Sequence, residues 1–153
     1  MKLATYRDGS RDGLLVVVSR DLRHASFATH TASRLQQVLD DWNFISPQLE
    51  ELYRQLNAGR VPHAFAFDPE RCMAPLPRAF QRADGAVYAG HGAAAASATA
   101  ALRLWQAGSD RLLGPHDPVT LPGTVMEPDF EAGLAAICGD LPAGASATQA
   151  LEG

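Results

Sequence analysis

The sequence predicts an α+β protein in which an N-terminal β-hairpin precedes two packed helices and then an incomplete β-rich segment. Three observations predict this class. Two short apolar stretches flank a turn-rich loop, two later segments repeat apolar residues at helical spacing, and prolines recur from residue 62 onward. Because prolines break long regular elements, we expect the regular part of the fold to come first.

The hairpin is expected from strands over residues 2–6 and 14–19. The second stretch reads LLVVVS, and such β-branched and apolar runs are typical of strands. Residues 8–13 between them contain two Asp-Gly steps, which suit the positive φ angles of turns. This loop is longer than two residues, so no turn type is assigned to it.

Two segments carry apolar residues at positions i, i+3, i+4 and i+7, which share one face of a helix. The first stripe is Leu35, Val38, Leu39 and Trp42. The second stripe is Leu49, Leu52, Tyr53 and Leu56. Thr31 or Ser33 could cap the first helix. We expect both stripes to face the core, because apolar helical faces are usually buried.

The bounds of the second helix follow from its capping residues. Ser46 is a favourable N-cap residue and Pro47 suits the first helical position. Gly59 fits just past the last turn. Residues 43–45 would then be a short connection that makes the two helices neighbours.

The sequence downstream is less regular. Residues 60–80 contain four prolines and are expected to form an extended connector, with a domain boundary near residue 75. Residues 92–101 are an alanine-rich, helix-prone stretch. Residues 129–138 show partial alternation and could form a strand, and residues 145–153 could begin a helix.

The composition excludes several classes of partner. The chain has 153 residues, 20% of them charged, and a net charge of -4. Aspartates interrupt the densest group of arginines, so no basic stripe suits nucleic acid. No apolar run reaches the roughly 20 residues that span a bilayer. Because no apolar stretch follows Lys2, a secretory signal is not expected, and we expect a cytoplasmic protein. Cys72 and Cys138, which lack zinc-site spacing, are then expected to be reduced thiols.

Two groups with histidine are candidates for chemistry. His91 could act with Asp84 or Glu131, as a base or metal ligand beside a carboxylate. A single histidine is more often packed or solvated than catalytic, and the Asp-Gly step at residue 84 is typical of a turn. The second group is His116 with Asp117, where Asp before Pro also favours a turn.

A third candidate is the acidic group Glu127, Asp129 and Glu131. At alternate positions of a strand these side chains could face one way, and oxygen-rich sites bind Mg²⁺ or Ca²⁺. Pro128 would interrupt such a strand, and a solvated acidic edge is the commoner arrangement. The residues alone thus indicate a soluble α+β protein with a candidate divalent-metal remnant.

Several longer strings are specific enough to indicate ancestry. In the first half they are MKLATY with DGSRDG, LQQVLDDWNF and FDPERCMAPLPRA. In the second half they are WQAGSD, LGP, DFEA and GDLP. These strings resemble a bacterial branch of the fumarylacetoacetate hydrolase family. The resemblance implies a family N-terminal domain over residues 1–75 and a partial, degenerate catalytic domain over residues 76–153.

The family resemblance also implies a chemistry. Family members bind Mg²⁺ or Mn²⁺ through carboxylates and use a histidine, assisted by an acid, to activate water. They cleave a carbon–carbon bond of acylpyruvates or β-diketones, or transform related 2-oxo acids. The metal can chelate the two carbonyl oxygens and stabilise the enolate that leaves.

Single residues of this chain match the family's site. His91 resembles the active-site histidine, Asp84 the first metal carboxylate, and Glu131 the first carboxylate of a Glu-x-Glu pair. The second member of that pair falls at Gly133, which offers no ligand. No glutamate closely follows His91, and the last metal carboxylate is expected beyond residue 153.

We therefore expect a truncated or degenerate paralogue that binds no metal and has no hydrolase activity by itself. One alternative is a metal-dependent hydrolase of acylpyruvates that a partner chain completes, since family members commonly form dimers. A second alternative is a binding or regulatory module. The expected partner is a second copy of the chain or a full-length family member.

Overall fold

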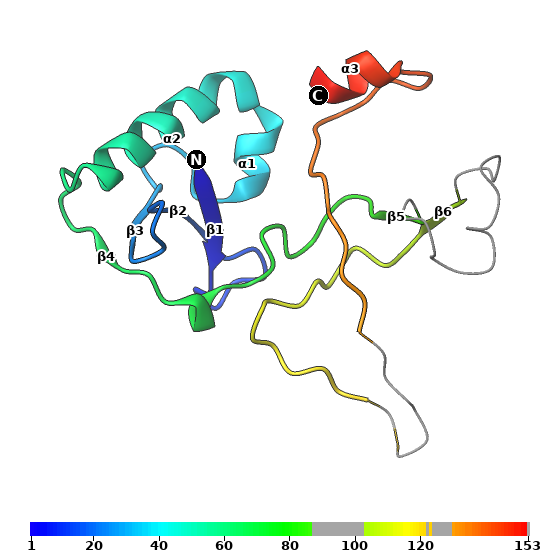
Figure 1. The fold of residues 1–153 in the computed structure, drawn as a ribbon, viewed down its shortest axis with the longest axis horizontal. Coiled ribbons are helices and arrows are strands. Elements are labelled where there is room, and N and C mark those ends of the chain that lie inside the picture. Colours follow the sequence, from blue (N-terminus) through cyan, green and yellow to red (C-terminus); the bar gives the residue numbers. More distant parts are fainter. Residues whose placement is uncertain (87–102, 122, 124–129, 153) are drawn as a thin grey trace.

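The computed structural model of the chain describes residues 1–86, 103–121, 123 and 130–152 (Figure 1). A four-stranded sheet has the order β1-β2-β3-β4, and a separate two-stranded sheet contains β5 and β6. Figure 1 shows the helices α1 and α2 against the four-stranded sheet, while β5 and β6 extend away from it. This arrangement confirms the predicted α+β class.

The four-stranded sheet begins with the predicted hairpin. Strand β1 (Lys2–Tyr6) pairs antiparallel with β2 (Leu14–Val18). The sheet continues with β3 (His24–Phe27) and β4 (Phe65–Ala66), both antiparallel to their neighbours. The prediction of an extended connector over residues 60–80 is therefore wrong in part, because this segment supplies β4 and a 3-10 helix, η1 (Pro69–Arg71). The domain boundary near residue 75 stays a prediction.

The helices differ from the prediction at their boundaries. Helix α1 spans Leu35–Asp40 and α2 spans Trp42–Asn57. Residues 43–45 are therefore helical, because the Ile45 amide already donates to the Asp41 carbonyl at 3.0 Å. Ser46 is not the N-cap, and Pro47 lies inside α2. Pro47 cannot donate a hydrogen bond to the carbonyl four residues earlier, and a proline ring inside a helix also crowds that carbonyl.

Of the other residues predicted to end the helices, those at the start of α1 were wrong and the one after α2 was confirmed. The Gln37 side chain, rather than Thr31 or Ser33, satisfies the start of α1: its Oε1 accepts the amides of Ser33 at 2.9 Å and Arg34 at 3.2 Å. Gly59 does follow the end of α2, with φ +67. A glycine just past a helix commonly adopts this left-handed conformation.

The sheet separates two small cores. On the face toward the helices, Leu15 and Val17 pack with buried residues of α1 and α2, including Val38 and Leu49. On the other face, one cluster is formed by Tyr6, Val16, Val18, Ala25 and Cys72. Successive strand residues point to opposite faces, so β2 is buried on both and reads as continuously apolar. Trp42, predicted to lie in the first helical stripe, is 48% exposed at the start of α2.

The downstream elements are short. Strand β5 (Ala83–Ala86) pairs antiparallel with β6 (Arg103–Gln106), so the turn expected at Asp84 is wrong. The strand expected over residues 129–138 is also wrong for residues 130–138, which are irregular. The final helix is confirmed as α3 (Ala147–Glu152). The Ala-rich stretch 92–101 lies outside the described residues.

Both cysteines are free thiols, as predicted, with Cys72 buried and Cys138 exposed. Burial in the second core raises the pKa of Cys72. In the part of the chain that the structure describes, no helix is long and apolar enough to cross a membrane.

Candidate functional site

Asp84 lies in the middle of β5, opposite Trp105 of β6. Its carboxylate is already engaged by Arg82, two residues earlier. Arg82 Nε donates to Asp84 Oδ1 at 3.1 Å, and Arg82 Nη2 lies 3.0 Å from Oδ2. Because residues two apart in extended backbone point to the same side, this pairing follows from the local geometry. Both oxygens of the first candidate metal ligand thus face a guanidinium.

The Glu-x-Glu position lies in the irregular segment 130–138. Glu131 is exposed there, and a Cβ added at Gly133 would meet no atom within 4 Å. The chain therefore has room for a side chain at Gly133 but no ligand atom. His91, Glu127 and Asp129 lie outside the described residues, so their roles stay predictions. Among the residues that are described, no three His, Cys, Asp or Glu side chains come together as a metal site.

The second candidate pair is His116 with Asp117, and its aspartate stabilises a backbone turn. Asp117 Oδ2 accepts the Gly114 amide at 2.7 Å, and the Asp117 amide donates to the Gly114 carbonyl at 3.2 Å. This is the turn expected from the Asp-Pro step. The Asp117 carboxylate also forms an ion pair with Arg7, whereas His116 is exposed.

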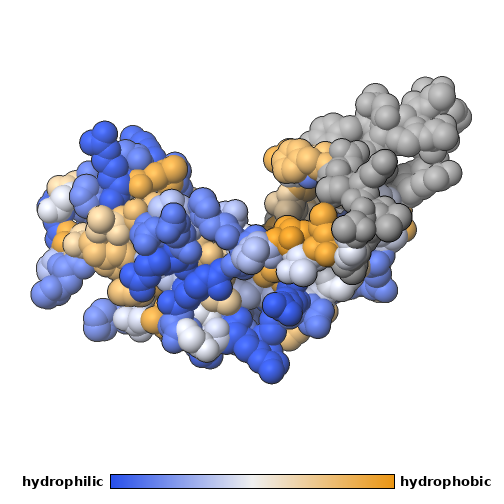
Figure 2. Space-filling view, turned by 90° about the horizontal axis from the view of Figure 1, so that it is seen from below, coloured by the Kyte–Doolittle hydropathy of each residue, from blue (hydrophilic) through white to orange (hydrophobic). Residues whose placement is uncertain are grey.

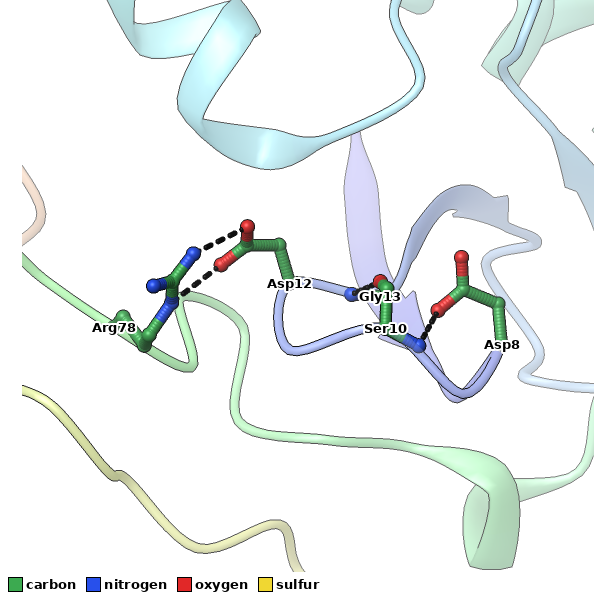
Figure 3. Close-up of polar contacts among 5 residues, drawn as sticks. All are labelled: Asp8, Ser10, Asp12, Gly13 and Arg78. Carbon is green, nitrogen blue, oxygen red and sulfur yellow. Dashed lines mark hydrogen bonds and ion pairs between the residues drawn. The ribbon is translucent and has the colours of Figure 1, made fainter.

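A polar cluster that the sequence did not single out lies in the β1–β2 loop (Figure 3). Asp8 Oδ1 accepts the Ser10 amide at 2.8 Å, and Ser10 Oγ accepts the Gly13 amide at 3.0 Å. Arg78 donates to both oxygens of Asp12, from Nε at 2.8 Å and from Nη2 at 2.6 Å. The two aspartates therefore shape the loop and anchor Arg78.

Hydrogen bonds favour the ionised form of the two aspartates in this cluster. The Ser10 hydroxyl and amide hold the pKa of Asp8 below its usual value. The bonds from Arg78 likewise lower the pKa of Asp12, and the carboxylate raises the pKa of Arg78 in turn. Hydrogen bonds to a charged carboxylate favour that form. Both carboxylates are thus ionised near neutral pH and already have donors.

A shallow hollow lies where the β2–β3 turn meets the end of α2. Its volume is about 350 Å³, and its lining residues are Ser19, Arg20, Asp21, His24, Leu56 and Asn57. The Ser19 hydroxyl donates to Asp21 Oδ1 at 2.6 Å and accepts the His24 amide at 2.9 Å. A nucleophile relay would place histidine between serine and aspartate, so this contact is a turn-stabilising one.

These observations define an α+β module, a sheet with two helices on one face, followed by a less compact segment that carries the candidate ligand Asp84. A family model described as Fumarylacetoacetase N-terminal domain 2 matches residues 1–78. This match covers just over half of the chain, and the chain belongs to the fumarylacetoacetate hydrolase family through this domain. A search of curated proteins found no match. Residues 1–78 are called the N-terminal module below.

Proposed function

We propose that this chain is a non-catalytic member of the fumarylacetoacetate hydrolase family, one that does not carry out metal-dependent hydrolysis by itself. The observation that supports this most directly is the Arg82–Asp84 pair. A divalent cation needs ionised oxygen ligands around it. A guanidinium on both Asp84 oxygens competes with the cation and adds positive charge at the place where the cation would bind.

Gly133 supports the same proposal from a second direction. Family members place a carboxylate two residues after the position of Glu131, and this chain has glycine there. Mg²⁺ loses its water reluctantly and requires nearly octahedral oxygen coordination. Asp84 and Glu131, one of them already paired with Arg82, are a poor substitute for four carboxylates. In this proposal the chain has kept the folded N-terminal module and has lost the metal-dependent hydrolysis of its ancestor.

The test is calorimetric titration of the chain with Mg²⁺ and with Mn²⁺, beside an acylpyruvate cleavage assay. We expect neither saturable binding nor turnover. Chelator-sensitive turnover by the unmodified chain would overturn the proposal. A gain of binding is expected in a double variant, Arg82→Gln with Gly133→Glu, which frees one carboxylate and adds another.

The matched control is Arg82→Gln with Gly139→Glu. A Cβ at Gly139 also meets nothing within 4 Å, so this variant adds the same charge at an equally open position outside the family's Glu-x-Glu spacing. We expect tighter Mn²⁺ binding in the Gly133→Glu pair than in the control. Equal binding by the two double variants would mean that general charge is responsible, and the family alignment of Gly133 would then be wrong.

A second candidate function is favoured by the surface around Asp84. Trp105, opposite Asp84, is 47% exposed, and its neighbour Leu104 is 66% exposed. Exposed apolar groups of this kind are often covered by another protein surface. In this alternative, a full-length family member completes the site, or the chain regulates that relative. Light scattering of the chain mixed with such a relative tests this, and two unchanged, separate masses would exclude it.

A further inference from the structure

Residues 109–117 return to the N-terminal module although the family model does not cover them. The Leu112 amide donates to the Pro77 carbonyl at 3.0 Å, and the Ala79 amide donates to the Ser109 carbonyl at 2.9 Å. These two bonds continue the antiparallel pairing of β5 and β6 toward the module. The two strands of this β5–β6 ribbon are thus joined at the base, next to the module.

Gly114 brings the returning segment into backbone contact with the module. It is buried, and a Cβ added there would lie 2.6 Å from the Cys72 carbonyl oxygen and 3.0 Å from the Met73 Cα. Real Cβ atoms essentially never come as close as the first distance, and the second is tighter than nine in ten real Cβ contacts. Neither contact is the flexible end of a side chain. A glycine is required here because the two backbones touch.

The Asp117 side chain also connects the Gly114 turn to the N-terminal module. One carboxylate oxygen accepts the Gly114 amide at 2.7 Å, and the other forms an ion pair with the Arg7 guanidinium. Arg7 directly follows β1, and its amide donates to the Arg71 carbonyl at 3.0 Å. One side chain therefore closes the Gly114 turn and connects it to the edge of the sheet.

We propose that residues 109–117 form a strap that fixes the base of the β5–β6 ribbon to the N-terminal module. The ordered structure attached to the module then continues to Asp117 and does not end where the family match ends at residue 78. Arg78, which binds Asp12 in the β1–β2 loop, anchors the other side of the ribbon base. Release of the strap would free the ribbon, with Asp84 on it, to move relative to the module. This inference does not depend on the proposed function.

Amide hydrogen exchange of the full chain tests the strap. In the unmodified chain, we expect the amides of Ala79, Leu112, Gly114 and Asp117 to exchange more slowly than unstructured peptide, because each donates a hydrogen bond. In Gly114→Val, we expect these four amides to exchange about tenfold faster or more. The amides of β1 and β2 should keep their protection. Gly133→Val, at an open position, is the matched control and should change none of these rates.

The alkylation rate of Cys72 separates local release from global unfolding. Exposed Cys138 gives the rate of an accessible thiol, and Cys72 should stay much slower while the module is folded. If Gly114→Val makes both thiols react alike, the milder variant Asp117→Asn decides the question. It should accelerate exchange at Gly114 while Cys72 stays protected. Peptide-like exchange of the strap in the unmodified chain, or unchanged exchange in Asp117→Asn with a folded module, would overturn the proposal.

Discussion

The N-terminal module and the segment after it differ in how far their large apolar side chains are buried. Leu15 and Leu49 of the module are fully buried, whereas Phe130 and Leu134 downstream are 87% and 91% exposed. Figure 2 shows apolar side chains, in orange, at the surface of the described residues. Burial of one leucine or phenylalanine contributes about 1.5–3 kcal/mol. The module therefore has its own source of stability, and the downstream segment depends on its attachment.

The attachment itself is mostly polar and backbone-mediated. The Arg7–Asp117 ion pair joins the two regions, and the Arg78–Asp12 pair holds the last residue of the module; both arginine side chains are 45% exposed. Exposed ion pairs usually contribute little, since water and salt compete for both groups. The close backbone contact at Gly114 and the amide hydrogen bonds of the strap are better suited to fix geometry. The comparison teaches that a family domain can have cores of its own while the following segment is held at a few points.

The largest expected difference between the two regions comes from a pair of leucine truncations. Leu49→Ala removes a side chain that is 0% exposed in the helix-side core, and we expect it to lower the free energy of unfolding by about 2–5 kcal/mol. Leu134→Ala, at a residue 91% exposed, should change it by less than about 0.5 kcal/mol. Urea unfolding followed by circular dichroism measures both. Equal losses would mean that the downstream segment has a core of its own.

A smaller effect is expected from two glycines of the β1–β2 loop. Gly13 has φ +63, and a Cβ there would lie 2.5 Å from the Tyr6 carbonyl oxygen and 2.7 Å from Thr5 Cγ2. Gly13→Ala combines left-handed strain with this overlap, so we expect a loss of about 2–4 kcal/mol.

Gly9→Ala is the matched variant, because Gly9 also has positive φ but nothing lies within 4 Å of its added Cβ. Only the conformational strain remains there, and we expect a loss of about 1 kcal/mol. The same urea experiment compares the two. If Gly9→Ala costs as much as Gly13→Ala, backbone strain alone explains both, and the close packing of the loop against β1 has no measurable role.

The elements that were predictable from sequence are those that local patterns determine. The hairpin follows from the β-branched run of β2, and the apolar stripes gave the buried faces of both helices. The start of α2 was misplaced because the Ser46-Pro47 signal is local, whereas Ile45 also packs against the core and keeps its own turn helical. Strand β4 has only two residues, too few for any periodicity to appear.

At the candidate site, too, local patterns predicted only what local residues determine. Asp84 was expected in a turn because of its Asp-Gly step, but pairing with β6, about twenty residues away, makes that step part of a strand. The Arg82–Asp84 contact depends on this extended backbone, so a sequence that indicates a turn at Asp84 does not predict it. Gly133 was visible from the sequence alone, because a missing ligand is a matter of residue identity. The role of Arg78 needed the fold, since Asp12 is 66 residues away.

The smallest expected effect concerns pH and the Asp12–Arg78 ion pair, which holds the last residue of the module. Arg78 lowers the pKa of Asp12 in the folded chain. As pH falls, the unfolded chain therefore takes up this proton first, at an aspartate pKa of about 3.9. The stabilisation by Asp12 is present above that pH and is lost as pH falls through the lower folded value.

Asp12→Asn should therefore flatten part of the decline in urea midpoint between about pH 5 and pH 2. Exposed Asp140, changed to Asn, is the control and should leave the decline as it is. Some decline must remain in Asp12→Asn, because Asp8 and Asp21 also have lowered pKa values from bonds to Ser10 and Ser19. Added salt should shrink the difference between Asp12→Asn and the unmodified chain, since salt screens exposed charges. A difference that persists at high salt would instead indicate that the hydrogen-bond geometry of Arg78, rather than its charge, holds the end of the module on the β1–β2 loop.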